Sequence, residues 1–165
     1  MENISRERVN KILEHTSYKE YVCKNEKAEA GRKFCRHDMV HFLDVARIAM
    51  ILKLKEGQQA EEELIYAAAL LHDIGRHVQY EDGTPHEEAS AVLAAPILAD
   101  CGFGDKETSV ILKAIVSHRN SKTSLESGLS GLLYRADKLS RSCFCCEAEK
   151  ECDWKKDKKN MRLIW

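Results

Sequence analysis

A histidine and an aspartate, His72 and Asp73, stand side by side at the end of an apolar stretch that runs from Ile65 to Leu71. Neighbouring residues in a helix point about 100° apart, so both side chains can lean toward one point beside the helix. Burying an imidazole and a carboxylate is unfavourable unless they are hydrogen bonded, paired or bound to a metal. The pair is therefore either a hydrogen-bonded contact in the core or part of a metal site.

Four more residues of ligand type recur along the chain, each in a different expected helical segment: His41, His86, His118 and Asp137. His86 falls in the first turn of its helix, where the helix dipole favours the neutral imidazole that a metal needs. Helices that bring imidazole and carboxylate groups to one point are a familiar way to build a metal site in an all-α core. Nitrogen and oxygen donors without sulfur suit Fe, Mn, Ni, Co or Zn, so the pattern predicts a divalent transition-metal site.

The placing of these residues depends on the helices that carry them. Apolar residues recur with helical spacing, and Ala, Leu, Glu and Lys dominate the composition. We expect Ser17 and Thr84 to begin helices as N-caps. The expected helices cover 5–30 with a break at 15–17, then about 36–55, 60–78, 84–100, 106–118 and 123–139.

Two of these helices are expected to matter most for the site. The helix at 60–78 is apolar around most of its circumference, which predicts a central, well-buried position. In the helix at 36–55, His37 and His41 are four residues apart and so share a face. The apolar stripe of that helix is predicted to include Val40, Leu43, Ala46 or Arg47, Met50, Ile51 and Leu54.

Length and charge narrow the class of protein. The chain has 165 residues, 44% of them apolar and 32% charged, which is typical of one soluble globular domain. The net charge of −1 argues against a protein that grips nucleic acid, and we see no signal peptide or membrane-length apolar run. We expect a single all-α, compact multi-helix bundle of about six to seven helices, cytoplasmic and without a membrane partner. Its parts are N-terminal helices at 1–35, a core at 36–141 and a Cys- and Lys-rich end at 142–165.

Four of the seven cysteines lie within ten residues near the C-terminus. In a cytosolic protein such cysteines are reduced thiols or metal ligands rather than disulfides. Cys143 and Cys146 have C-x-x-C spacing, and with Cys152 they could hold a structural Zn²⁺. Cys23 or Cys35 could supply a fourth thiolate if the two ends of the chain meet. The alternative is that all of them are free thiols.

The order of these residues, H…HD…H…H…D, resembles the HD-domain superfamily of metal-dependent phosphohydrolases. The resemblance spans about 37–141 and is most specific at three stretches, 41–46, 70–76 and 135–139. It implies that a basic set of four residues holds one metal: His41, His72, Asp73 and Asp137. His86 and His118 match the additional histidines of members that hold two metals, in which the aspartate of the HD pair bridges the ions. Arg76 stands where the family often has lysine, so a cation is kept.

This resemblance implies hydrolysis of a phosphoester or phosphoanhydride in a nucleotide or another small phosphorylated metabolite. A metal pair lowers the pKa of a bound water to about 7 and stabilises the attacking and leaving oxygens. Asp73 is the expected bridging catalytic carboxylate, with Arg76 facing the phosphate. The remaining residues expected to bind substrate lie close to ligands in the sequence: His37, Arg119, Lys138 and Arg141.

Two other functions use the same residues. Some HD proteins carry a di-iron centre and oxidise C–H or C–P bonds with dioxygen, and others could bind a nucleotide without catalysis. We rank hydrolysis first because a compact chain leaves little room for additional substrate-specific elements, and because all six ligand positions are filled.

Overall fold

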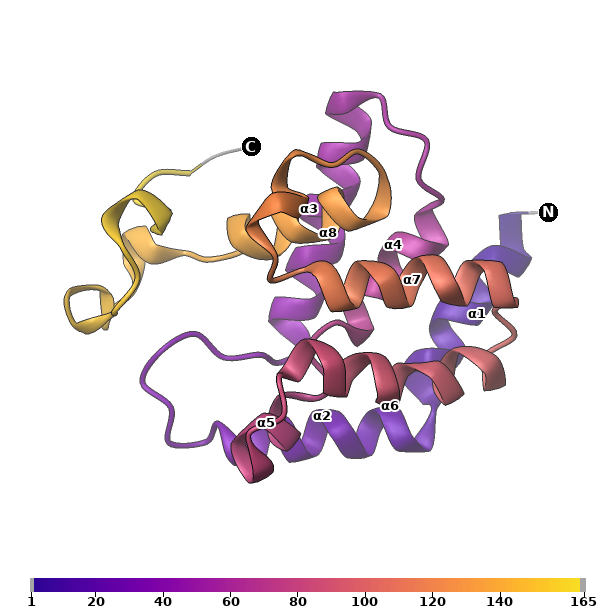
Figure 1. Cartoon of the computed structure of the whole chain (residues 1–165), viewed down its shortest axis with the longest axis horizontal. Helices are drawn as coiled ribbons and strands as arrows, with labels where there is room; N and C mark the ends of the chain where they lie inside the picture. The colour runs from indigo at the N-terminus through magenta and orange to yellow at the C-terminus, as the bar shows by residue number, and fades with distance from the viewer. Residues whose placement is uncertain (1, 164–165) are drawn as a thin grey trace.

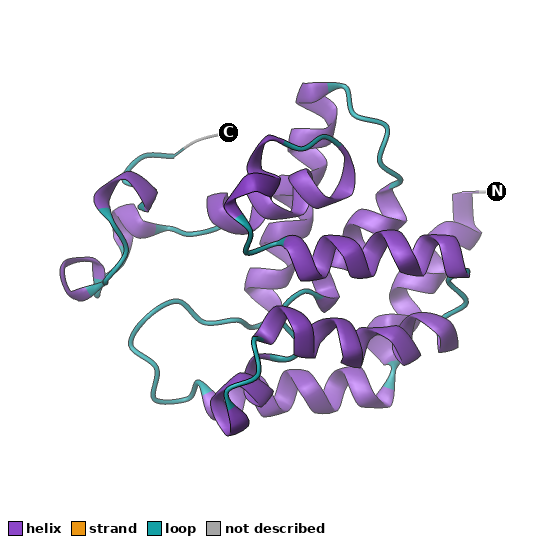
Figure 2. Ribbon diagram, viewed as in Figure 1, coloured by secondary structure: helices purple, strands orange, loops and turns teal. Residues whose placement is uncertain are grey.

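The structure, a computed structural model, describes residues 2–163, with side chains from residue 7 onward. Within these residues the chain forms eight α-helices and four short 3₁₀ helices, and no strand (Figures 1 and 2). The expected all-α, multi-helix architecture is confirmed, with one α-helix more than expected. The α-helices are α1 (Glu2–Glu14), α2 (Thr16–Ala28), α3 (Met39–Glu56), α4 (Glu62–Leu71), α5 (Arg76–Asp82), α6 (His86–Asp100), α7 (Asp105–Ser117) and α8 (Gly128–Leu139). The 3₁₀ helices are η1 (Ser121–Leu125), η2 (Cys143–Cys145), η3 (Glu149–Glu151) and η4 (Lys156–Lys158).

Helix α4 lies at the centre of the bundle, as its apolar sequence predicts. It contacts α1, α3, α6, α7 and α8, and all of its residues from Glu63 to Leu71 except Tyr66 are buried. The buried Glu63 accepts a hydrogen bond from Nε of Arg8 in α1 at 3.1 Å. The same guanidinium donates to Glu107 of α7 at 2.9 Å, which ties α1 and α7 to the central helix.

The helix expected at 60–78 is in fact two helices, α4 and α5, separated by a turn at 72–75. At this turn the N–H of Gly75 donates to Oγ of Ser90 in α6, at 2.9 Å. A Cβ at position 75 would lie 2.5 Å from the backbone nitrogen of Ser90 and 2.8 Å from the carbonyl carbon of Ala89. Only glycine permits this close approach of the turn to α6, and the turn brings His72 and Asp73 to the end of α4.

Only part of the predicted stripe of α3 faces the core: Ala46 is buried, and Leu43 and Met50 are partly buried against the core. Its buried residues are Phe42, Val45, Ala46 and Ala49. The predicted stripe included Val40 and Leu54, which are 68% and 72% exposed, and Ile51, which is also exposed. The small residues Ala46 and Ala49 allow α3 to pack closely against α4 and α8, and this contact sets the buried face.

Several helix ends also differ from prediction. The residue before α2 is His15, whose Nδ1 accepts a hydrogen bond from the N–H of Ser17 at 3.2 Å, so Ser17 is not the N-cap. Thr84 does not cap α6, because Pro85 is still extended with ψ of 127° and the helix begins one residue later. The segment expected to start a helix at 123 forms η1, and α8 begins at Gly128, which has φ of +78°. His37 lies before α3 rather than within it, and Asp38 caps that helix by accepting from the N–H of His41.

The chain after α8 leaves the bundle and folds into short turns beside it (Figure 1, yellow). We call residues 142–163 the tail. In the same view the tail lies on the side of the bundle where the loop between α2 and α3 projects. None of the helices in residues 2–163 combines the length and apolar content that crossing a membrane requires.

Candidate metal centre

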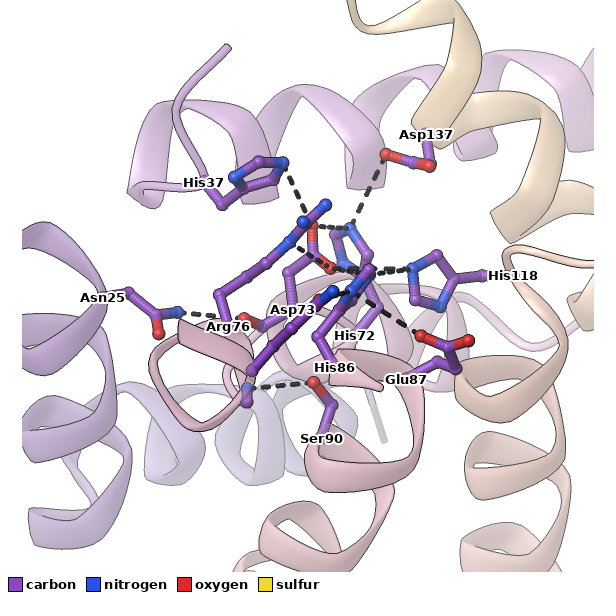
Figure 3. A network of polar contacts seen from close by, with 12 residues as sticks. Asn25, His37, His72, Asp73, Arg76, His86, Glu87, Ser90, His118 and Asp137 are labelled. Carbon is purple, nitrogen blue, oxygen red and sulfur yellow. Dashed lines mark hydrogen bonds and ion pairs between the residues drawn. The ribbon is translucent and has the colours of Figure 1, made fainter. Parts of the chain in front are cut away.

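The six predicted ligand residues converge on one region from five parts of the fold. Figure 3 shows five of them: His72, Asp73, His86, His118 and Asp137. His41 comes from the first turn of α3, His72 and Asp73 from the turn after α4, and His86 from the start of α6. His118 follows the last residue of α7, and Asp137 lies in the last turn of α8. All except the partly buried His41 are buried.

The first of two compact groups consists of His41, His72, Asp73 and Asp137. Nε2 of His41 lies 3.3 Å from Nε2 of His72 and 3.5 Å from Oδ1 of Asp137. Oδ2 of Asp73 lies 3.2 Å from Nε2 of His72 and 3.5 Å from Nε2 of His41. Two donors bound to one ion at about 2.0–2.2 Å lie roughly 3 to 3.5 Å apart, so these spacings are close to those of a coordination sphere.

The second group consists of Asp73, His86 and His118. Oδ1 of Asp73 lies 3.1 Å from Nε2 of His86 and 3.5 Å from Nε2 of His118, and the two imidazole nitrogens are 3.3 Å apart. Asp73 therefore turns one carboxylate oxygen toward each group. This is the arrangement of a carboxylate that bridges two ions.

Hydrogen bonds at the other ring nitrogen fix the tautomer of each histidine. Nδ1 of His72 donates to the carbonyl of Ala69 at 2.7 Å, and Nδ1 of His118 donates to the carbonyl of Ile115 at 2.6 Å. Since a carbonyl can only accept, the proton of each neutral ring is on Nδ1 and the lone pair is on Nε2. This outer hydrogen bond is the one that metal-ligating histidines usually make.

The remaining two histidines follow the same pattern. Nδ1 of His86 faces Oε1 of Gln79 at 2.6 Å. Nδ1 of His41 is 3.3 Å from Oγ of Ser140, whose hydroxyl donates to the carbonyl of Asp137 at 2.7 Å and so is free to accept. All four Nε2 lone pairs thus point inward.

The interior of the cluster fits a cation better than a hydrogen-bond network. When the imidazoles are neutral, their lone pairs face each other and face carboxylate oxygens, with no proton to join them. Oδ1 of Asp73 is buried and has no hydrogen-bond partner, a state that is unfavourable unless an ion satisfies it. The donor set and the orphaned oxygen together fit one or two divalent metal ions.

The pKa shifts of three of these residues favour the metal-binding protonation states. Burial alone would raise the pKa of Asp73, but positive charge nearby, that of Arg76 included, holds it well below its ordinary value. Burial opposes ionisation of Asp137 as well, and Lys138 nevertheless lowers its pKa. Burial lowers the pKa of His86 to about 4, so this ring is neutral at physiological pH.

Two residues that the sequence did not single out hold the turn that carries the pair. Asn25 of α2 is fully buried, and its amide nitrogen donates to the backbone carbonyl of Asp73 at 2.9 Å. Ser90 of α6 accepts the N–H of Gly75, as described above. An asparagine in an otherwise polar helix gives no sequence signal of such a role, because the contact joins residues far apart in the chain.

A pocket of about 450 Å³ opens beside the first group. Its wall includes His41 and Asp137 of that group, together with His37, Arg36 and Arg141. The pocket thus presents basic side chains next to the candidate ligands, and Lys33 and Lys159 line it as well.

His37 is held in the pocket wall by a buried carboxylate, Glu29, that sequence reasoning missed. Oε2 of Glu29 accepts the backbone N–H of His37 at 2.7 Å, and Oε1 accepts from its Nδ1 at 2.6 Å. Tyr80 donates to Oε1 as well, at 2.7 Å. The free Nε2 of His37 lies 3.8 Å from Oδ2 of Asp73, so it faces the first group from outside.

The other residues expected to bind phosphate are placed unequally. Arg141 lines the pocket, while Nε of Arg76 is buried 3.4 Å from Oδ1 of Asp73. Lys138 pairs with Asp137. Arg119 is half exposed, does not line the pocket and lies 3.6 Å from Glu87.

Neither compact group of ligand atoms in residues 2–163 includes a cysteine. The seven cysteines are free thiols, and Cys35, Cys143, Cys145, Cys146 and Cys152 line the outer part of the same pocket. The zinc site expected at 143–152 therefore remains a prediction.

Comparisons with known proteins identify the same region. The model of the HD domain family matches residues 39–142. An uncharacterized protein of Clostridium beijerinckii is 43% identical over 159 residues, which cover 96% of this chain and 99% of that protein. Ribonuclease Y of Enterococcus faecalis is 36% identical over 100 residues, but these cover 61% of this chain and only 17% of that protein. Among solved structures, a predicted HD superfamily hydrolase from an uncultured Thermotogales bacterium matches with a TM-score of 0.60 and 26% identity, covering 87% of this chain and 81% of that one.

Proposed function

The chain belongs to the HD domain family, and on that premise we propose that it is a metal-dependent phosphohydrolase acting on a nucleotide or a similar small phosphorylated compound. The observation that carries this proposal is the position of Asp73. Its two oxygens face two separate sets of nitrogen and oxygen donors. Two ions held side by side in this way are typical of enzymes that hydrolyse phosphate esters.

The residues divide into two metal sites that share one carboxylate. His41, His72 and Asp137 would hold the first ion, His86 and His118 the second, and Asp73 would contribute one oxygen to each. When bound, such a pair lowers the pKa of a water molecule and stabilises charge on the attacking and leaving oxygens. Nitrogen and oxygen donors admit Fe, Mn, Ni, Co or Zn.

The other polar groups have roles of positioning and charge neutralisation. The pocket next to the first site contains Arg36 and Arg141, which can pair with phosphate oxygens. Arg76 lies against Asp73 and would offset negative charge at the shared carboxylate. His37, whose Nδ1 is engaged by Glu29, presents Nε2 as a hydrogen-bonding group toward the first site.

The volume of the pocket and the net charge of the chain both favour a small substrate. A volume of about 450 Å³ is in the range of pockets that hold one small ligand. The name of the related ribonuclease Y refers to cleavage of a phosphodiester, which is the same class of reaction. With a net charge of −1, we expect this chain to lack the basic surface that long nucleic acids need.

The proposal is tested with metal-free protein that is reloaded with Mn²⁺, Fe²⁺, Co²⁺, Ni²⁺ or Zn²⁺ and assayed for phosphate release. The panel contains nucleoside mono-, di- and triphosphates, dinucleoside polyphosphates, sugar phosphates and a short RNA oligonucleotide. We expect metal-dependent turnover of one of the small compounds. Asp73→Asn should lose this turnover, whereas the exposed control Asp100→Asn should keep it. Assays without oxygen separate hydrolysis from dioxygen chemistry. The proposal is overturned if the metal-loaded protein hydrolyses no compound of the panel, or if substrate is lost only when oxygen is consumed.

A further inference from the structure

The tail is an ordered segment that has almost no hydrophobic core. Between Arg141 and Leu163, all of which the structure describes, Ala148 is the one buried residue. The large apolar side chains of Phe144, Trp154, Met161 and Leu163 are exposed. Segments this short usually need disulfides or a metal to stay folded, because they cannot bury enough apolar surface.

Polar contacts connect the tail to the bundle, but none of those described here is fully buried. Asn160 donates to the carbonyls of Lys138 and Arg141 at 2.8 and 2.9 Å. The guanidinium of Arg141 stacks on Trp154, 3.6 Å from the ring centre, and Lys33 pairs with Glu151. Exposed pairs of these kinds contribute about 1 kcal/mol or less each, which is comparable to the entropy of ordering a single residue.

Thiols of the tail and of the loop between α2 and α3 line one pocket. Cys143, Cys146 and Cys152 of the tail and Cys35 of the loop line the same pocket. Cys145, whose Sγ donates to the carbonyl of Ser142 at 3.4 Å, lines the pocket as well.

The backbone turns of the tail suit thiolate ligands. The N–H of Cys146 donates to the carbonyl of Cys143 at 3.3 Å, which closes a tight turn over the C-x-x-C sequence. A second turn, closed by the N–H of Cys152 on the carbonyl of Glu149 at 3.3 Å, brings Cys152 back toward it. A C-x-x-C turn with further thiols supplied from elsewhere in the chain is a common zinc-binding arrangement.

We propose that Cys35, Cys143, Cys146 and Cys152 bind a structural Zn²⁺ that pins the tail to the α2–α3 loop and so completes one wall of the pocket. The structure selects Cys35 over Cys23 as the fourth ligand, because Cys23 lies on α2 and does not line the pocket. The sulfurs do not form one compact group of ligand atoms here. Zinc draws them together on binding, since thiols alone have no mutual attraction and metal binding is coupled to local folding.

This site is distinct from the His–Asp centre in its donors and does not depend on the proposed hydrolysis. Thiolates select zinc, whereas the buried centre offers only nitrogen and oxygen. A loss of zinc from the tail therefore leaves the six His and Asp ligands intact.

The experiment measures zinc in the full-length protein by elemental analysis and by release with a mercurial thiol reagent, read with a metallochromic indicator. To remove zinc held at the His–Asp centre, the measurement is repeated in a His72→Ala/Asp73→Ala background. We expect about one zinc per chain that only the thiol reagent releases, with X-ray absorption showing sulfur neighbours at about 2.3 Å. Cys35→Ser, Cys143→Ser, Cys146→Ser and Cys152→Ser should each lose this ion, whereas Cys23→Ser and Cys145→Ser should keep it.

Limited proteolysis and circular dichroism distinguish a local loss of zinc from a variant that fails to fold. We expect the four ligand variants to be cleaved within the tail at least tenfold faster than wild type, while the helical core gives the same circular dichroism. Zinc retained in Cys146→Ser or Cys35→Ser, zinc lost equally from Cys145→Ser, or wild-type protein that carries no thiol-bound zinc would each overturn the proposal. An iron–sulfur chromophore in place of zinc would also overturn it.

Discussion

The side-chain amide of Asn25 donates a hydrogen bond to the backbone carbonyl of Asp73 at 2.9 Å, across 48 residues of sequence. The amide oxygen of Asn25 accepts the backbone N–H of His77 at 2.8 Å. One buried residue of α2 therefore bridges the turn that carries Asp73 and the helix that follows it. Its helix lies outside the family-matched region, so the N-terminal part of the chain takes part in forming the centre.

Replacing Asn25 with alanine should destabilise the protein by about 2–3 kcal/mol, because a buried carbonyl and a buried N–H both lose their partner. Urea unfolding of metal-free protein measures this change. Asn10→Ala, at an exposed position on α1, is the matched control and should differ from wild type by less than about 0.5 kcal/mol. Equal stability of Asn25→Ala and wild type would show that the turn holds without the amide.

Gly75→Ala should be destabilising and should also weaken binding at the second metal site. The new Cβ would lie 2.5 Å from the backbone of α6, so α6 must move, and His86 lies in its first turn. Overpacking of this kind costs about 1–3 kcal/mol. Gly31→Ala is the matched control, because a Cβ there meets nothing within 4 Å. Thermal unfolding and metal titration of both variants check the prediction, and tight two-metal binding in Gly75→Ala would contradict it.

Glu29 should make the stability of the protein depend on acid pH. Burial alone would raise the pKa of Glu29, but hydrogen bonds from His37 and Tyr80 lower it from 4.5 to about 2. The unfolded chain then binds the proton more tightly, so the stabilisation is full above pH 4.5 and is lost as the pH falls toward 2. Between pH 6 and pH 3 this loss amounts to about 2 kcal/mol.

The measurement compares urea unfolding of wild type and Glu29→Gln at several pH values from 6 to 3. The variant should be less stable than wild type at pH 6. As the pH falls to 3, its free energy of unfolding should decrease by about 2 kcal/mol less than that of wild type. Some decrease remains in the variant because its other acidic groups still titrate. Glu88→Gln, which alters an exposed glutamate, should follow the wild-type curve. Parallel curves for Glu29→Gln and wild type would mean that the hydrogen bonds do not favour the ionised carboxyl group.

The fold class and the six candidate ligands could be predicted from the sequence because both depend on local patterns of residues. Helical periodicity marks helices, and His72, His86 and His118 each stand where a periodic stretch begins or ends. The orientation of α3 was less accessible to sequence reasoning. Ala46 of the predicted stripe is buried, but Val40 and Leu54, which fit the same helical spacing, are exposed.

The residues that sequence reasoning missed act through long-range contacts. Asn25 and Glu29 lie in a polar stretch where nothing distinguishes them from solvent-exposed neighbours, and only the fold buries them. The break at 72–75 had a signal in Gly75, but a glycine near a helix end does not reveal that another helix packs on its Cα. His37 was expected to share a helix face with His41 and instead reaches the pocket from the preceding loop.

The two-site arrangement predicts a specific pattern of metal loss among single variants. Asp73 is the one residue common to both groups of ligand atoms found in residues 2–163. Asp73→Ala should therefore abolish both binding events, whereas His86→Ala should remove the second and leave the first, whose ligands remain. Loss of an outer hydrogen bond to a ligand weakens binding about 10- to 100-fold, so loss of a ligand itself should weaken it by more than about 100-fold.

Calorimetric titration of metal-free protein with Mn²⁺ gives the stoichiometry directly, with His15→Ala, outside both groups, as the control. Two ions retained in Asp73→Ala would refute the shared carboxylate, and complete loss from His86→Ala would indicate that the two sites fill only together.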